Sequence, residues 1–595
     1  MIVSDNKDII GSSATPAGAP TTGTSTASLS PTGAPIAGTL SIGMPPTTLT
    51  RRSFIGTLGV GAASLAALSL GGALAGCAKG ESPTDDSATA KDALTPHQVI
   101  IAMGAGNEPA GGFDPLFGWG ASEHAHEPLI QSTLVTTTVD MGFENDLATA
   151  YSVSDDGLIW TFEIRDDVCF TNGESLTAAD VAFTINSIIA SKGAEIDLSM
   201  IEEAVAASDT VVTLTLRTPY NALLYTLAVM GIVPEHAYGP DYGDHPIGSG
   251  RYMLEQWDKG QQVIFKANPD YYGTPVKMER VVVVFMEDDA SLAAARSGQV
   301  DVASTTAVYS TQAIDGYSIL ACKSVDSRGI SLPTDQPGGT IKDGETTSPL
   351  GNAVTADVAI RRAINTAIDR QLMVDNVLNG YGTVAYSVCD GMPWASPDMR
   401  VETSVEKARQ MLEEAGWVES AEGVRTKDGT PAVLEILYPS NDQVRQGMAN
   451  ELANQLAVVG IKVEVKGLGW DDIYPRSFSD PVLWGWGSNS PVELYSLNHS
   501  TSSSNFSHYG SSVTDGYLDA ALAAPDIKDS SELWRKAQWD GAVGVAPQGS
   551  ATWVWLANID HLYFKRDNLV IAAQKLHPHG HGWAVTNNVD QWTWK

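Results

Sequence analysis

A pair of arginines, an uncharged segment and a cysteine follow one another between residues 51 and 77, and they decide where the folded body can begin. Arg51 and Arg52 precede Ser-Phe-Ile at 53–55, which is similar to the twin-arginine export motif. The sequence departs from that motif at Gly56, where lysine is common. Residues 54–76 are small or apolar and carry no charge, as in the central part of a signal peptide. We therefore expect export through the twin-arginine route.

Cys77 ends this uncharged segment. Leu-Ala-Gly at 74–76 followed by Cys77 matches the bacterial lipobox, in which the cysteine is acylated and the chain is cut just before it. The alternative is an uncleaved membrane helix, since residues 54–76 are long enough to cross a bilayer. The lipobox and the glycines at 56, 59, 61, 71 and 72 favour cleavage. We expect lipidation at Cys77 and a protein tethered to the outer side of the cell membrane, at the cell surface or in the periplasm.

The segments that flank the signal are poor in large apolar side chains. Residues 1–46 are rich in Ala, Gly, Pro, Ser and Thr and cannot build a core. The sequence thus predicts a disordered tail and signal peptide over 1–76, a lipidated flexible stalk over 77–96, and a folded body from residue 97. Met44, just before the arginines, is a second candidate for the start of the chain, and that choice stays open.

Size and charge restrict the function classes. The 595 residues, 43% of them hydrophobic, are too many for one compact domain, so two or three domains are expected. The net charge of −34 would repel nucleic acids and anionic lipid headgroups. It would attract a cation or a cationic peptide, although a solvated acidic surface is the better default explanation. Cys169, Cys322 and Cys389 form an odd set without metal-site spacing, so one disulfide at most can form among them.

The apolar pattern of the body predicts a mixture of strands and helices. Short apolar or alternating runs predict strands at 98–102, 158–165, 211–216, 281–285, 434–438 and 462–466. Apolar residues at helical spacing, with capping residues before them and glycines after several of them, predict helices at 177–188, 357–378, 404–415 and 444–459. The order of strand, helix and strand from 434 to 466 implies a parallel sheet flanked by helices.

Four stretches of the body form a distinctive set when they are taken in order. The first is Asp-Asp-Gly-Leu-Ile-Trp-Thr-Phe-Glu-Ile-Arg at 155–165, with Phe-Thr-Asn-Gly-Glu at 170–174 and Thr-Ala-Ala-Asp-Val at 177–181. The second is Pro-Ile-Gly-Ser-Gly-Arg-Tyr at 246–252, with Asn-Pro-Asp-Tyr-Tyr-Gly at 268–273. The third begins with Val-Ala-Ile-Arg-Arg-Ala-Ile at 358–364, and the fourth covers residues 408–417. Together they resemble the peptide/nickel solute-binding proteins of family 5, which serve ABC transporters, and the resemblance extends from about residue 97 to the C-terminus.

The resemblance implies an α/β, two-lobed fold like that of periplasmic binding proteins (type II, Venus flytrap), with an extra N-terminal subdomain. Such proteins close on their ligand by hinge motion. We expect lobe I in residues 97–325 with 488–595, the extra subdomain near 127–230, and lobe II in residues 326–487. The hinge is then expected near residues 324–329 and 485–487.

The resemblance also places residues 484–495 in the cleft, after the second hinge crossing. The aromatic residues there either stack on the ligand or pack at the hinge. Peptide binders of the family hold the ligand's amino terminus with an aspartate just before the proline, where this chain has Ser490, and Glu493 is a candidate substitute. The ligand-binding candidates are Trp119, His124, His126, Glu127, Arg328, Trp484, Trp486, Asn489, Glu493 and Tyr495.

Two groups of histidines suggest a metal, although each has a plainer explanation. His124 and His126, two residues apart, would point the same way on an extended segment, which suits nickel; they would otherwise be ordinary hydrogen-bonded residues. His577, His579 and His581 are tentative metal ligands, or else residues of a loop that bond to backbone. No cofactor is required, and nickel enters only as a possible transported ligand.

The sequence contains no motif of a catalytic site: Gly-x-Ser-x-Gly, His-Glu-x-x-His and the Walker loop are all absent. We therefore expect no enzyme. The predicted function is capture of short peptides, or of a similar small ligand, for an ABC permease and ATPase complex, by a monomer that does not bind nucleic acid. The alternatives are a nickel-chelate-binding protein of the same family and an extracellular receptor that does not transport.

Overall fold

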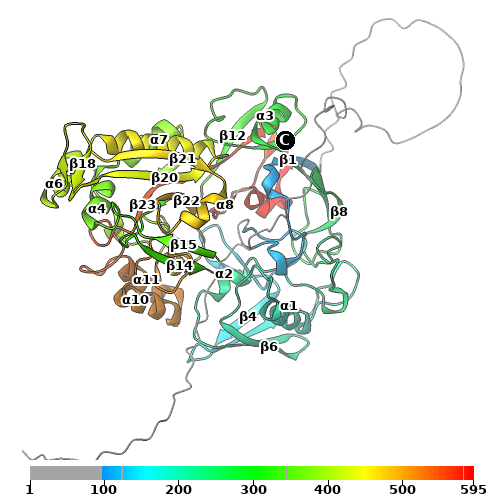
Figure 1. The fold of residues 1–595 in the computed structure, drawn as a ribbon. Helices are drawn as coiled ribbons and strands as arrows, with labels where there is room; N and C mark the ends of the chain where they lie inside the picture. Colours follow the sequence, from blue (N-terminus) through cyan, green and yellow to red (C-terminus); the bar gives the residue numbers. More distant parts are fainter. Residues whose placement is uncertain (1–96, 122–124, 344–345, 581) are drawn as a thin grey trace, which may run out of the picture. The chain divides into compact units, whose positions relative to one another are not determined.

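A computed structural model describes residues 97–121, 125–343, 346–580 and 582–595 (Figure 1). The predicted signal segment, Cys77 and the stalk lie outside these residues, as do His124 and His581. None of the helices in the described ranges is both long enough and apolar enough to cross a membrane.

The first large sheet is mixed and contains seven strands. Its central strand β1 (Gln98–Met103) runs parallel to both of its neighbours, and the outer strands pair antiparallel. Val99, Ile101 and Met103 of β1 are fully buried, so the apolar run at the start of the body forms the middle of this sheet. The strand order is β12 (Tyr317–Cys322), β24 (His561–Arg566), β11 (Val302–Thr305), β1, β10 (Arg280–Phe285), β9 (Gln262–Ala267) and β8 (Tyr252–Asp258).

The second large sheet contains six strands and carries the predicted strand, helix and strand unit. β20 pairs parallel with β21, and α7 (Gln443–Ala457) connects them and packs on both (Figure 1). Only this end of the sheet is parallel, because β13 pairs antiparallel with both of its neighbours. The strand order is β16 (Gly382–Val384), β23 (Trp553–Ile559), β13 (Ser327–Ser331), β22 (Val482–Trp486), β20 (Val433–Pro439) and β21 (Lys462–Leu468).

A four-stranded antiparallel sheet lies within the predicted extra subdomain. Helix α1 (Ala178–Ala190) packs against it (Figure 1), and the predicted cap at Thr177 is confirmed. Thr177 and Asp180 form a reciprocal capping box at the start of this helix. The strand order is β4 (Ala148–Val153), β5 (Ile159–Ile164), β7 (Val211–Leu216) and β6 (Ile201–Ser208).

The remaining elements are shorter or lie around these sheets. The helices are α2 (Leu223–Leu227), α3 (Asp288–Arg296), α4 (Val358–Ala367), α5 (Arg370–Val377), α6 (Val405–Glu414), α8 (Trp470–Ile473), α9 (Val492–Asn498), α10 (Ser512–Ala523) and α11 (Ile527–Gln538). The small sheets pair β14 (Gly339–Asp343) with β15 (Thr346–Leu350), β2 (Val135–Thr137) with β3 (Phe143–Asn145), and β25 (Leu569–Val570) with β26 (Thr593–Trp594). A further small sheet joins β17 (Val418–Glu419), β18 (Arg425–Lys427) and β19 (Thr430–Pro431).

One predicted helix is divided in the structure. Residues 357–378 form α4 and α5, which are separated at Ile368 and Asp369. Asp369 caps α5, because its carboxylate accepts hydrogen bonds from the backbone N–H groups of Gln371 and Leu372. An aspartate inside an apolar helical pattern thus started a second helix rather than continuing the first.

The segment after β22 divides its strands between the two large sheets. After β22 the chain forms α9, α10 and α11 and then returns to the six-stranded sheet as β23, so the segment from 488 does not all belong with the seven-stranded sheet. The passage between the sheets is the single residue Asp560, between β23 and β24. The two strands follow one another in the sequence with only Asp560 between them, and their pairing places them in different sheets.

The two passages between the large sheets lie side by side. One is residues 323–326 between β12 and β13, and the other is Asp560. The N–H of Ile559 donates to the carbonyl of Asp326 at 2.9 Å, and the Ser324 hydroxyl donates to the carbonyl of Ile559. Lys323 pairs with Asp560 at 2.8 Å. The backbone of both passages is therefore joined where the sheets meet.

Candidate functional site

A glycine in the second large sheet is the centre of the candidate site. Gly485 of β22 stands opposite Arg328 of β13 in the antiparallel register. A Cβ placed on Gly485 would collide with Arg328 Nη1 and Arg445 Nη2, and would lie 2.7 Å from His579 Cε1. Glycine weakens a strand interior and often marks a place where another group approaches closely. Here two guanidinium groups and an imidazole approach the same backbone position.

The two arginines come from different elements and have different partners. Arg328 is 1% exposed and makes a two-pronged ion pair with Asp326, in which the Nη2 to Oδ2 distance is 3.2 Å. Arg445, 8% exposed, lies in the first turn of α7 and donates from Nη1 to Asp442 at 2.8 Å. Burial and the charge of Arg328 lower the pKa of Arg445 to about 10, so Arg445 is still a cation at neutral pH.

Asp326 is the anion beneath this cluster, and its carboxylate is completely buried. It accepts from Arg328 and contacts two histidine nitrogens, Nδ1 of His579 at 2.7 Å and Nε2 of His561 at 3.1 Å. Burial opposes its ionisation, but the charge of Arg328 and the contacts with the histidines prevail, so its pKa lies well below the usual range. Asp326 is therefore a carboxylate at every physiological pH.

Aromatic side chains form a wall beside the arginines. Trp484 stacks on Phe506 with ring centres 4.3 Å apart and on Trp470 at 5.4 Å. The Arg445 guanidinium lies 5.9 Å from the centre of the Trp470 ring. Trp486 is partly exposed beyond Trp484, and its indole N–H has no acceptor within the described ranges. The predicted tryptophans of residues 484–486 thus pack in the sheet, with only Trp486 reaching outward.

Glu493 lies in the first turn of α9, next to the end of β22. Its carboxylate accepts from the N–H of Gly487 at 2.8 Å. Burial, together with repulsion from Asp326, raises its pKa to about 7 despite that hydrogen bond. Glu493 is therefore only partly ionised near neutral pH. It is the residue that the sequence analysis named as a candidate partner for a ligand amine.

The other candidates of this segment lie outside the arginine cluster. The side-chain amide of Asn489 donates to the carbonyl of Leu576 at 3.2 Å. The ring of Tyr495 stacks on His499 with centres 4.4 Å apart, and its hydroxyl lies 3.2 Å from Asp519. Tyr495 therefore packs between α9 and α10.

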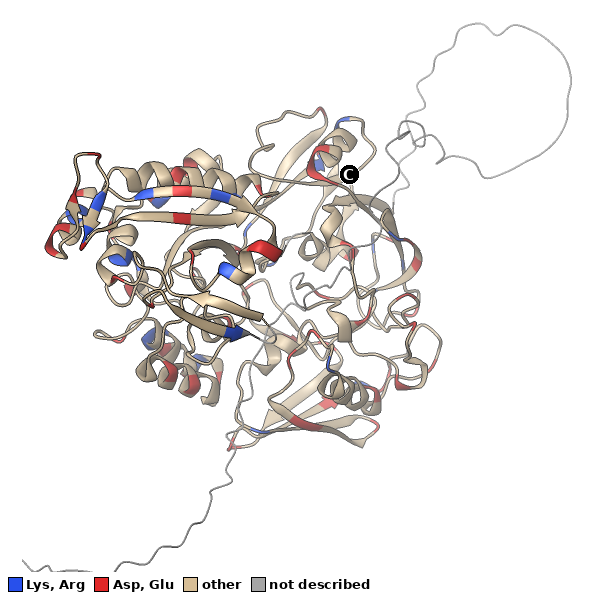
Figure 2. Ribbon diagram, viewed as in Figure 1, with Lys and Arg blue, Asp and Glu red and all other residues tan. Residues whose placement is uncertain are grey.

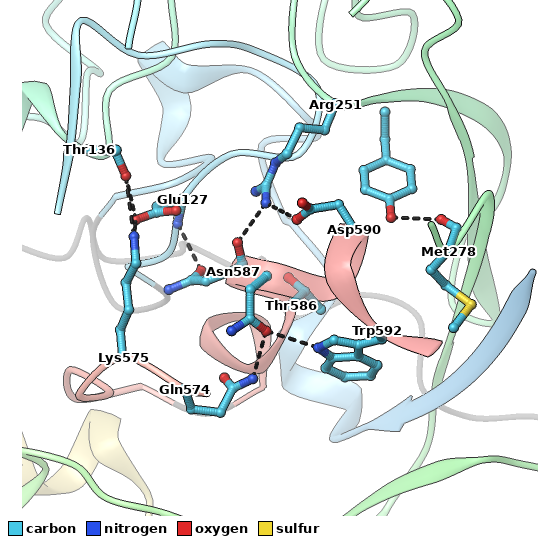
Figure 3. A network of polar contacts seen from close by, with 12 residues as sticks. Glu127, Thr136, Arg251, Met278, Gln574, Lys575, Thr586, Asn587, Asp590 and Trp592 are labelled. Carbon is cyan, nitrogen blue, oxygen red and sulfur yellow. Dashed lines mark hydrogen bonds and ion pairs between the residues drawn. The ribbon is translucent and has the colours of Figure 1, made fainter. Parts of the chain in front are cut away.

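The predicted residues near 119–127 lie in a different place. Trp119 and His126 are each 2% exposed and pack against Trp583 in the core of the seven-stranded sheet, with ring centres 4.9 and 5.6 Å from it. Glu127 is engaged as well: it pairs with Lys575 and accepts from Thr136 at 2.7 Å (Figure 3). These contacts hold the C-terminal segment to the rest of the protein.

The same network continues through the C-terminal segment (Figure 3). Arg251 pairs with Asp590 and also donates to the carbonyl of Asn587, whose side-chain oxygen accepts from the N–H of Glu127 at 3.0 Å. The Arg-Tyr pair at 251–252 belongs to one of the family-like stretches. Its arginine thus anchors the C-terminal segment.

The histidines near the C-terminus, His577 and His579, have different partners. His577 is 1% exposed and contacts Nδ1 of His561 at 3.1 Å and Gln574 at 3.2 Å, while His579 contacts Asp326. Burial lowers the pKa of both His577 and His579, so both are neutral at pH 7. The described part of the chain contains no group of three or more His, Cys, Asp or Glu able to hold a metal ion. The predicted site with His581 stays a prediction.

Charged residues of both signs lie on β20 and β21 (Figure 2). Figure 2 shows acidic and basic residues interspersed along β20 and β21. Lys462 pairs with Glu464 at 2.7 Å on that surface.

The cysteines Cys169, Cys322 and Cys389 are all free, so none of them forms a disulfide within the described residues.

Comparison with known proteins identifies the family. The family described as "Bacterial extracellular solute-binding proteins, family 5 Middle" matches residues 142–508. Protein XP55 of Streptomyces lividans is 34% identical over 489 residues, which cover 78% of this chain and 85% of that protein. This chain belongs to the family 5 solute-binding proteins.

Two further relatives of this family 5 protein carry ligand names. The oligopeptide-binding protein AppA of Bacillus subtilis is 26% identical over 489 residues, covering 76% of this chain and 86% of the relative. The crystal structure of NikZ from Campylobacter jejuni in complex with Ni(L-His) matches with a TM-score of 0.69 and 25% identity. That match covers 84% of this chain and all of NikZ.

These findings confirm three expectations. The family resemblance is correct, the mixed α/β fold is that of family 5 structures, and the chain is a solute-binding protein rather than an enzyme. As a family 5 protein it works outside the cytoplasm with an ABC transporter on a small ligand.

Sequence reasoning missed two members of the arginine cluster, Asp326 and Arg445. Arg445 was visible only as the third residue after Asp442, a helix cap, where an exposed position is the usual expectation. Asp326 precedes β13 in the predicted hinge region, but nothing in its neighbours indicated complete burial. Arg445 lies in helix α7 and Asp326 in the passage before β13, so only the folded chain brings them together.

Proposed function

We propose that this family 5 protein captures a short peptide, or an organic ligand of similar size, and delivers it to an ABC permease and ATPase complex. The observation that carries the proposal is the cluster at Gly485, where buried arginine N–H groups without acceptors among the described residues lie beside an aromatic wall and near Glu493. Ligand sites of binding proteins combine a few convergent polar groups with apolar walls. The name of the relative AppA agrees with a peptide ligand.

A second candidate is a nickel chelate, and the similarity to NikZ in complex with Ni(L-His) favours it. The described residues supply no group of three metal ligands. A nickel ion would therefore arrive with most of its donors from a small organic molecule, and the protein would recognise the chelate.

We also propose that the two large sheets are the centres of two lobes. Residues 323–326 and Asp560 would then form the hinge, because they are the passages between the sheets. Closure about joined strands is a common motion of binding proteins. These proposed lobes differ from the lobes expected from the sequence only because α9, α10, α11 and β23 are assigned to the second lobe.

Native mass spectrometry of the purified full chain tests the function. The protein is incubated with a tri- and pentapeptide library, and separately with nickel plus histidine, and the retained mass is read. Retained peptide without metal supports capture of peptides. Stoichiometric nickel with histidine would favour the second candidate, and no retained mass from either mixture would contradict both.

The role in import is separated from a receptor role by uptake. Cells that express the protein with its permease and ATPase are expected to accumulate the retained ligand, and deletion of the permease is expected to abolish accumulation. Accumulation that does not depend on the permease would contradict the transport role.

Export and lipidation are also proposed, from the arginine pair and Cys77. Cys77→Ser is expected to release the protein from the membrane fraction into the soluble exported fraction. Arg51→Lys with Arg52→Lys is expected to keep it inside the cell. Membrane attachment that survives the loss of Cys77 would contradict the lipid anchor.

A further inference from the structure

We propose that Asn221 is a latch that holds the two lobes together by capping the end of α10 from the other lobe. Asn221 lies in the extra subdomain, between β7 and α2, whereas α10 lies between β22 and β23 of the six-stranded sheet (Figure 1). The inference rests on the two proposed lobes, in which the subdomain moves with the seven-stranded sheet and α10 with the six-stranded sheet. The protein would thus supply part of the closing contact itself, without help from a ligand.

The first argument is an acceptor left open at the end of α10. The last carbonyls of an α-helix have no N–H partner within the helix. In a regular continuation of α10, which ends at Ala523, the carbonyl of Ala521 would accept from the N–H of residue 525. That residue is Pro525, which has no N–H. The carbonyl of Ala521 therefore needs a donor from elsewhere.

Asn221 supplies that donor and two more. Its side-chain amide donates to the carbonyl of Ala521 at 2.7 Å and to that of Ala524 at 3.2 Å. Its backbone N–H donates to the carbonyl of Leu522 at 3.0 Å. Asn221 is only 6% exposed, so water has little access to these hydrogen bonds. One residue of the subdomain thus satisfies three carbonyls at the end of a helix about 300 residues further along the chain.

The second argument is the apolar surface beside these hydrogen bonds. Leu223, two residues after Asn221, is completely buried and belongs to the same hydrophobic cluster as Leu522 of α10. Tyr225 of α2 meets Trp394, which lies between β16 and α6, edge to face with ring centres 6.0 Å apart. Separation of the lobes would expose this surface to water. Apolar burial and the hydrogen bonds of Asn221 therefore favour the same arrangement.

The third argument is that the contact is able to open. Asn221 Oδ1 is buried and has no donor among the described residues. A buried acceptor without a donor is costly, and water would satisfy it once the lobes separate. Over the same part of the chain, the four-stranded sheet pairs with no strand of the six-stranded sheet, and the contact lies outside the proposed hinge at residues 323–326 and 560. These features suit a latch that releases better than a permanent joint.

The experiment measures the distance between the lobes in the full chain, after unfolding and refolding have removed any copurified ligand. Spin labels are attached at two exposed positions, through Glu203→Cys in β6 and Lys528→Cys in α11, and the distance is read by double electron–electron resonance. Cys77→Ser and Cys169→Ser remove two competing thiols, and the other two native cysteines are buried. Protein with the native Asn221 is expected to populate a shorter, closed distance and a longer, open one.

Variants then locate the effect. Asn221→Ala removes two of the three hydrogen bonds and is expected to lower the ratio of closed to open protein about tenfold. Pro525→Ala gives α10 an N–H that competes for the carbonyl of Ala521, so a smaller shift in the same direction is expected; residue 525 is exposed, and this variant should fold normally. Asn186→Ala is the matched control, because Asn186 bonds to the backbone of Ala204 within the subdomain, at 2.8 and 3.0 Å. It should keep the wild-type distances.

The outcomes separate the latch from the proposed function. An unchanged ratio in Asn221→Ala, or a single distance in every variant, would overturn the latch, because the subdomain would then move with α10. An equal shift in Asn186→Ala would also overturn it, since any loosening of the subdomain would then have the same effect. If circular dichroism shows that Asn221→Ala does not fold, unchanged distances in Pro525→Ala would overturn the latch. The distances are measured without ligand, so failure to retain any ligand contradicts the proposed function and not the latch.

Discussion

Replacement of Asp326 by asparagine tests whether the buried cluster depends on this one anion. The carboxylate is 0% exposed, and it is the only carboxylate paired with Arg328 within the described residues. The amide of an asparagine would keep the shape of the side chain but leave Arg328 as a buried cation without a counter-charge. Breaking a buried ion pair in this way costs about 3 to 5 kcal/mol. The free energy of unfolding of Asp326→Asn, from urea denaturation at pH 7, should fall by that amount.

Two further variants make this prediction refutable. Asp442→Asn removes the partner of Arg445, but Asp442 is 23% exposed and water can replace it, so a loss of about 1 kcal/mol is expected. Asp326→Asn combined with Arg328→Met removes both charges and should recover part of the loss. The reasoning is refuted if Asp326→Asn costs no more than Asp442→Asn, or if the double variant is less stable than both single variants.

Three other perturbations have defined outcomes. Because the pKa of Glu493 is about 7 in the fold against an ordinary value of 4.5, its ionised form destabilises the protein as pH rises between those values. Glu493→Gln should therefore gain about 2 to 3 kcal/mol relative to wild type between pH 5 and pH 8 in urea titrations, and a gain toward low pH would contradict the assignment. Glu127→Gln should lower the melting temperature but leave ligand affinity unchanged, because its carboxylate pairs with Lys575; weaker binding in calorimetry would restore it as a ligand residue. Asp369→Ala should cost about 1 kcal/mol of stability, since it removes the cap of α5, and an unchanged urea midpoint would argue against that cap.

Local patterns were enough for much of the fold. The strands at 211–216 and 98–102, the capped helix from Thr177 and the unit from β20 to β21 were all predicted, because alternation, helical spacing and capping depend on neighbouring residues. The family-like stretches also lie within such local elements, so the family could be recognised before any contact was known.

Long-range pairing decided what the local patterns left open. Only Asp560 separates β23 from β24 in the sequence, yet the two strands belong to different sheets because each pairs with strands distant along the chain. For the same reason Trp119 and His126, predicted to face a ligand, became core beside Trp583.

The sequence by itself determined the family, the α/β character and the expectation of a small ligand. The tertiary structure alone brought Arg328, Arg445 and Asp326 together around Gly485, from β13, α7, the chain passage and β22. Burial and shared counter-charges are properties of positions in space, and neither leaves a trace in the spacing of residues along a chain. That is why the sequence did not connect Arg445, three residues after a helix cap, with Arg328 and Asp326.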